Sequence, residues 1–146
     1  MTKDAHFSLA TVLKYRTNIE EEVARETAGL RRKLEELELK LMDMERQKDE
    51  AIGYYRDRGP KTVEEINIFH SFLSTLEMGI IRQKKKVSDM ARDYERKREE
   101  LISAAMDKKI METLRDREWN EYQRMLFSAE QKELDEIATN NYGRVL

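Results

Sequence analysis

The chain has 146 residues, of which 40% are charged and 39% hydrophobic, with one Pro, five Gly and no Cys. A net charge of −2 gives no general attraction to nucleic acid or anionic membrane, and the lack of cysteine excludes disulfides and thiolate metal sites. No stretch approaches the roughly 18 apolar residues of a membrane span, and the first residues are too polar for a signal peptide. The composition predicts long, largely solvated helices in a soluble cytoplasmic protein.

The first predicted helix covers about residues 6–57. Its apolar residues recur every three or four positions, which is the spacing of a coiled-coil seam. Ten of the fourteen positions in its two seam rows are apolar. The rows are Leu9, Arg16, Val23, Leu30, Leu37, Met44, Ala51 and Leu13, Glu20, Thr27, Leu34, Leu41, Lys48, Tyr55. The pattern therefore predicts a helix that packs along its length on a partner helix.

A turn is predicted at residues 58–61. Gly59 suits the left-handed position that follows a helix end, and Pro60 prevents the helix from continuing. Thr62 and Glu65 have the spacing of a capping box, so a new helix is expected to begin there.

The second predicted helix covers about residues 62–140 and repeats the seam pattern. Ten of the twelve positions in its rows as far as residue 104 are apolar. The rows are Ile66, Leu73, Ile80, Val87, Tyr94, Leu101 and Phe69, Leu76, Gln83, Met90, Lys97, Ala104. Two such helices joined by a short turn pack antiparallel. The predicted fold is all-α, a long antiparallel two-helix coiled coil (αα-hairpin) that forms a single elongated domain over residues 1–146.

The second helix is predicted to outrun the first. Folding at residues 57 and 62 pairs residue i with about 119 − i, which places Phe7 opposite Glu112 and leaves about 113–146 as an overhang. The overhang has apolar residues on two sides, because Phe127 and Leu134 lie about 120° or more from Tyr122. The first side comprises Trp119, Tyr122, Leu126 and Ile137. This pattern indicates a docking element that contacts more than one surface, and the alternative is a tail that folds back or frays.

A second excess of apolar residues lies beside the turn, outside the seam rows. It comprises Ile68, Phe72, Met78 and Ile81. A two-helix coil needs only its seam, so these residues indicate either thicker packing near the turn or a partner site.

The residues that usually carry enzyme chemistry are absent or scattered. His6 and His70 lack metal-ligand spacing, and there is neither a phosphate-binding Gly-rich loop nor a Ser-His-Asp set. Basic runs such as residues 82–86 are flanked by acidic residues, which favours a solvated face over phosphate binding. The sequence predicts a protein that is not an enzyme and has no catalytic, cofactor or metal site.

Both ends of the chain resemble the FliJ family of flagellar type III export proteins. The opening "FSLATVLKYRTNIEEEVARE" is similar to that family's beginning at Phe7, Leu9, Val12, Leu13, Arg16, Glu20, Glu21 and Ala24. The ending "QKELDEIA", residues 131–138, is similar to its closing Lys-x-Leu-Asp-Glu-x-Ala motif. The length and the single turn fit as well, so the resemblance covers nearly the whole chain.

The resemblance implies a central-stalk component of the flagellar export apparatus that also escorts export chaperones, at the cytoplasmic face of the inner membrane. It implies that the end carrying both termini binds the hexameric export ATPase (FliI type), through Phe7, Leu13, Trp119, Tyr122, Leu126, Phe127, Leu134, Asp135 and Ile137. It further implies that Phe72, Leu76, Gly79 and Gln83 contact the export gate protein (FlhA type). Gly79 and Gln83 depart from the Ala and His associated with that patch, so the Phe72–Leu76 half is the better match.

Two other interpretations stay open at this point. One is the related stalk protein of a virulence-type injectisome, which the residues alone do not separate from the flagellar protein. The other is a structural coiled coil that dimerises with itself and buries the overhang between two copies.

Overall fold

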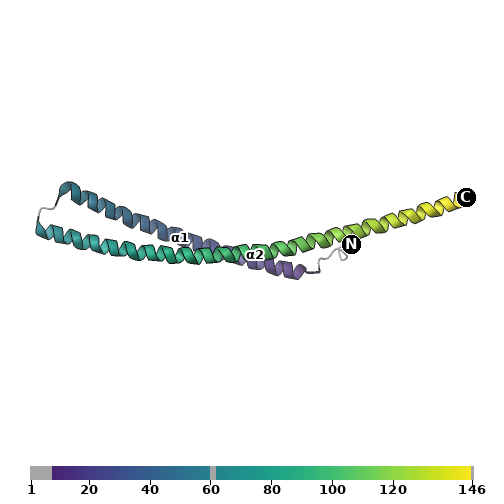
Figure 1. The fold of residues 1–146 in the computed structure, drawn as a ribbon, viewed down its shortest axis with the longest axis horizontal. Helices are drawn as coiled ribbons and strands as arrows, with labels where there is room; N and C mark the ends of the chain where they lie inside the picture. Colours follow the sequence, from purple (N-terminus) through teal and green to yellow (C-terminus); the bar gives the residue numbers. More distant parts are fainter. Residues whose placement is uncertain (1–7, 60–61, 146) are drawn as a thin grey trace. The chain divides into compact units, whose positions relative to one another are not determined.

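The computed structural model describes residues 8–59 and 62–145, with side chains as far as Arg144. Two helices account for nearly all of these residues: α1 spans Ala10–Arg58 and α2 spans Val63–Val145 (Figure 1). The described residues contain no strand. The predicted all-α hairpin is therefore confirmed. Phe7 and Pro60, on which two of the predictions fall, lie outside the described residues.

The turn forms for the reasons that the sequence indicates. Gly59 has a φ of 68°, a left-handed conformation that a side chain would disfavour, and its N–H donates to the carbonyl of Tyr55 at 2.8 Å. On the far side of the turn, the Thr62 hydroxyl accepts a hydrogen bond from the N–H of Glu65 at 3.2 Å. Both helix ends at the turn are thus satisfied locally.

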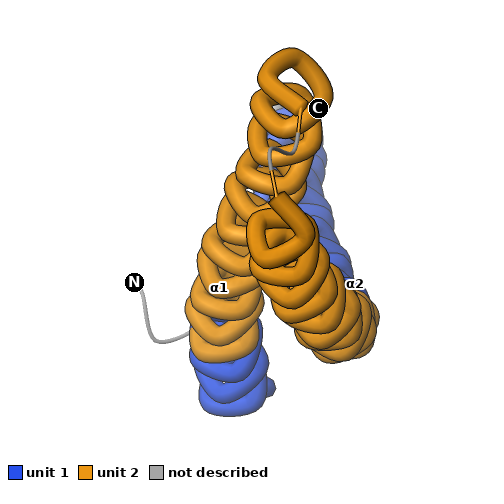
Figure 2. The backbone as a smooth tube through the Cα atoms, turned by 90° about the vertical axis from the view of Figure 1, so that its left-hand side faces the viewer, with its two compact units in different colours: residues 1–21, 102–146 blue, residues 22–101 orange. Residues whose placement is uncertain are grey.

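The contacts between the helices divide the chain into two units, which Figure 2 shows in different colours. Unit 2 consists of Glu22–Leu101 and therefore contains the turn. Unit 1 consists of Met1–Glu21 together with Ile102–Leu146. In each unit a segment of α1 lies against a segment of α2.

In unit 2 the predicted seam is the observed core. Every seam position of this unit is buried or half-buried, and the most enclosed are Thr27, Ile80 and Gln83. The two polar members of this group are satisfied, because the Thr27 hydroxyl donates to the Val23 carbonyl at 2.7 Å and Gln83 donates to the Leu37 carbonyl at 3.0 Å. The hydrophobic effect along this seam holds the helix pair together.

The register between the helices differs from the predicted one. The Thr27 hydroxyl lies 3.5 Å from the Lys97 carbonyl oxygen, whereas the sequence rule would have placed about residue 92 there. Part of the difference comes from the turn, since α1 ends and α2 begins one residue later than predicted. The rest is fixed by side-chain packing next to the turn, where the rings of Tyr55 and Phe69 stack with their centroids 3.8 Å apart.

Candidate docking surfaces

The pairing in unit 1 combines apolar seam residues, such as Ala104 and Leu13, with charged and polar side chains. The Arg16 guanidinium lies 3.4 Å from a carboxylate oxygen of Asp107, and the Lys108 ammonium lies 3.7 Å from a carboxylate oxygen of Glu20. Among the described residues, the most distal hydrogen bond of this pairing is the one that the Ser8 hydroxyl donates to a carboxylate oxygen of Glu118 at 3.3 Å. The pairing therefore reaches Glu118, further along α2 than the predicted limit at Glu112, for the same reason that the register is shifted in unit 2.

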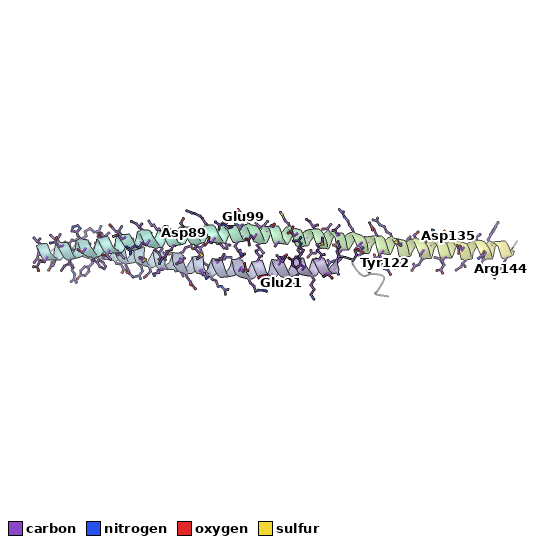
Figure 3. All side chains as sticks on the ribbon, turned by 90° about the horizontal axis from the view of Figure 1, so that it is seen from below. Glu21, Asp89, Glu99, Tyr122, Asp135 and Arg144 are labelled. Atoms are coloured by element: carbon purple, nitrogen blue, oxygen red, sulfur yellow. The ribbon has the colours of Figure 1, made fainter. Side chains whose placement is uncertain are left out.

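Beyond this contact α2 continues without a partner among the described residues. Every side chain from Gln123 to Arg144 is exposed. Figure 3 shows Asp135 and Arg144 on a stretch of α2 that has no segment of α1 beside it. We call residues 123–144 the tail. The tail contains six exposed large apolar side chains: Met125, Leu126, Phe127, Leu134, Ile137 and Tyr142.

The apolar groups near the start of the tail lie on more than one side of α2. The rings of Trp119 and Tyr122 are neighbours, with centroids 5.9 Å apart. Phe127 lines a shallow groove of about 380 Å³ with Asn120, Gln123 and Arg124. Since Phe127 lies about 140° around the helix from Tyr122, these are separate surfaces.

The residues expected to bind the ATPase are not all exposed to solvent. Six of them are exposed: Trp119, Leu126, Phe127, Leu134, Asp135 and Ile137. Tyr122 is half-buried, and Leu13 is a half-buried seam residue of α1. Phe7 lies outside the described residues. The structure thus leaves the tail residues available for a partner and assigns Leu13 to the pairing between the helices.

The four residues expected at the export gate are divided in the same way. Phe72 is 52% exposed, whereas Gln83 is only 3% exposed and its amide is bonded to α1. Leu76 and Gly79 are half-buried, and a Cβ atom at Gly79 would meet the Met44 methyl group at 3.0 Å. Gln83 therefore lies in the seam, as its heptad position predicts, and its assignment to the gate contact stays a prediction. The open apolar neighbour of Phe72 on α2 is Ile68, one turn away.

Sequence reasoning missed two further groups of exposed apolar residues. One comprises Leu39 and Met42 on α1, and the other comprises Ile102, Met106 and Ile110 on α2. The heptad pattern could have identified them, because none of them falls in a seam row. Large apolar residues off the seam have no role in a two-helix coil and identify candidate contact surfaces.

The described residues offer little else that could carry chemistry. They contain no group of three or more His, Cys, Asp or Glu side chains that could hold a metal ion, and neither helix has a segment long and apolar enough to cross a membrane. Hydrogen bonds to Glu26 and Glu100 raise the pKa of the seam residue Lys97. This is an ordinary effect of acidic neighbours on a structural residue.

These features define a two-helix coiled-coil protein whose candidate binding surfaces are exposed apolar helix faces. A family model described as Flagellar FliJ protein matches residues 5–146, nearly the whole chain. The chain belongs to this family, whose members are components of the flagellar type III export apparatus. No curated protein and no solved structure matches the chain.

Proposed function

We propose that this protein is the central-stalk component of the flagellar export apparatus, positioned at the cytoplasmic face of the inner membrane. In this proposal the tail of α2 enters the ring of the hexameric export ATPase. The surface around Phe72 contacts the export gate, and the protein also escorts export chaperones. It has no chemistry of its own and acts by joining the other components.

The single observation that supports this proposal best is the exposed tail. Each of Leu126, Phe127 and Leu134 leaves apolar surface in water, and full burial of one such side chain is favourable by about 1.5–3 kcal/mol. A helix without a partner buries little apolar surface, so nothing offsets the conformational entropy that it loses on ordering. A binding site that covers it from several sides would supply that burial. A ring of subunits around a central helix is such a site. Asp135 and Glu136 add carboxylates that can meet basic side chains there.

Truncation after Tyr122 tests this function. The truncated chain keeps the contacts between the helices that the described residues make, so its thermal unfolding midpoint should be nearly unchanged. Its retention of the cognate export ATPase in a pull-down should be lost, as should any stimulation of ATP hydrolysis. The matched control is Met78→Ser, which removes an exposed apolar side chain in unit 2 and should retain the ATPase. Full retention by the truncated chain would contradict the proposal.

Substitutions at two adjacent residues test the proposed contact with the export gate. Phe72→Ala should leave stability nearly unchanged, because the ring is half exposed, and should weaken binding to the gate's cytoplasmic linker. Leu73→Ala should instead destabilise the protein by about 2–5 kcal/mol, since Leu73 is a seam residue. If both substitutions destabilise equally, Phe72 belongs to the core and the gate surface lies elsewhere.

A further inference from the structure

α2 carries an apolar ridge in unit 1 that the hairpin does not use. It consists of Ile102, Met106, Ile110 and Leu114, four residues apart, and all four are exposed, from 36% at Leu114 to 62% at Met106. None of them is a seam position. The seam side of the same stretch, formed by Ala104, Lys108 and Met111, faces α1 and is buried or half-buried. The ridge therefore lies on the outer side of the pair.

A second ridge runs beside the first and is polar. It consists of Lys109, Thr113 and Arg117, again four residues apart. Between the two ridges lies an open groove of about 500 Å³, lined by Met106, Lys109, Ile110, Thr113, Leu114 and Arg117. The Thr113 hydroxyl donates to the Lys109 carbonyl at 2.9 Å, so its proton needs no hydrogen-bond acceptor from a partner. One wall of the groove is thus apolar, and the other has a cation at each end.

These two cations differ from several of their charged neighbours, which form ion pairs. Asp107 pairs with Arg16, Glu112 with Lys108, and Asp116 with Arg115. Among the residues that the structure describes, neither Lys109 nor Arg117 forms an ion pair. They are eight residues apart, which corresponds to about 12 Å along the helix. The groove consequently has an unmatched positive charge at both ends of its polar wall.

We propose that this groove binds an amphipathic helix of a partner protein that carries two carboxylates about two turns apart. A ridge of residues at i and i+4 fits the groove between two such ridges on another helix, which is the commonest packing of helices in globular proteins. The partner's apolar ridge covers Met106, Ile110 and Leu114, and its carboxylates meet Lys109 and Arg117. Because the groove lies on the outer side, the partner adds a third helix without opening unit 1.

The test uses the full-length chain and two designed helical peptides of about 21 residues, with the same leucine ridge. One peptide has glutamates two turns apart beside that ridge, and the other has lysines at the same positions. Fluorescence anisotropy should show the glutamate peptide binding at least about tenfold more tightly. Ile110→Ser should weaken its binding about tenfold or more. Lys109→Glu combined with Arg117→Glu should reverse the preference, so that the lysine peptide binds better.

Two substitutions outside the groove serve as matched controls. Met125→Ser removes a 71% exposed apolar side chain, and Lys132→Glu reverses an exposed charge, both in the tail. Neither should change peptide binding, and all variants should keep the unfolding midpoint of the parent chain. Truncation after Tyr122 leaves the groove intact and should still bind the glutamate peptide, which separates this result from the ATPase test.

Three results would overturn the proposal. The first is equal affinity for the two peptides, or no binding of either. The second is unchanged binding by Ile110→Ser or by the double charge reversal. The third is a dimer of the free chain, seen by sedimentation, that Ile110→Ser dissociates, because the groove would then be occupied by a second copy.

Discussion

Unit 1 and unit 2 use the same seam spacing with different residues. Continued at the same spacing beyond residue 104, the seam rows take in Lys108, Met111, Arg115, Glu118 and Tyr122. Charged residues occupy two of the twenty-one seam positions in unit 2, but five of the ten that unit 1 contributes as far as Tyr122. Apolar side chains, most of them half-buried, and one aromatic stack fill the seam of unit 2. Both units also have ion pairs between the helices, such as Lys97–Glu26 in unit 2 and Arg16–Asp107 in unit 1, and each contributes only about 0.2–1 kcal/mol. The units therefore differ in how much of the seam is apolar. Heptad spacing alone therefore predicts which residues lie between the helices, but not how stable their pairing is.

The difference separates stability from binding. Unit 2 contains the turn and the more apolar seam, whereas unit 1 contains the tail and the groove beside Ile110. Regions that bind partners tend to come from the less stable parts of a protein. The following predictions test this division, from the largest expected effect to the smallest.

The largest effect is expected in the seam of unit 2. Ile80 is 6% exposed, and Ile80→Ala should lower the free energy of unfolding by about 2–5 kcal/mol. Met111→Ala, at a half-buried seam position of unit 1, should cost less than half as much. Urea denaturation followed by circular dichroism measures both. Equal losses would show that the two seams are equally firm.

Unit 1 should respond to salt more than unit 2, because charged residues occupy half of its seam positions and only two of the twenty-one in unit 2. Raising NaCl from about 0.05 to about 0.5 M should speed amide hydrogen exchange of residues 10–21 by about two- to fivefold. Exchange in the seam of unit 2 should change little. Replacing both Glu20 and Lys108 by leucine should reduce the salt response. An equal response in both units would remove the distinction drawn from their charged seam positions.

Two glycines inside helices of unit 2 provide a matched pair. Gly53→Ala should stabilise the protein by about 0.5–1 kcal/mol, because alanine favours the helix and no atom lies within 4 Å of its Cβ. Gly79→Ala should stabilise less, because its Cβ meets the Met44 methyl group at 3.0 Å. Thermal unfolding of the two variants measures the difference. A larger gain from Gly79→Ala would show that the helices are not in close contact there.

The smallest effect concerns pH. The carboxylates of Glu26 and Glu100 raise the pKa of Lys97 in the folded protein. The resulting stability is fully present below the pKa of an unfolded lysine, about 10.4, and is lost as pH rises through the higher folded pKa. Lys97→Gln should therefore lose a little stability at pH 8 and show a shallower decline above about pH 10.4. A variant that follows the parent chain across this range would exclude the contribution.

Much of this molecule could be predicted from the sequence because a coiled coil is a repetitive local pattern. The seam rows identified the core of unit 2, and Gly59 with Thr62 located the turn. The register could not be predicted, since it depends on how Tyr55 and Phe69 stack across the helices. The heptad row also placed Gln83 in the seam, where its amide donates to the Leu37 carbonyl. The family resemblance assigned the same residue to the gate contact, and that assignment stays a prediction.

Hydrogen exchange of the free full-length chain, resolved by segment, tests the central claim most directly. We predict the slowest exchange in the seam of residues 22–101, intermediate exchange in residues 10–21 and 102–118, and fast exchange throughout residues 123–144. Adding the export ATPase should slow the last segment most. If residues 123–144 of the free monomer were as strongly protected as unit 2, the tail would be stabilised within its own chain, contradicting its assignment as a docking element.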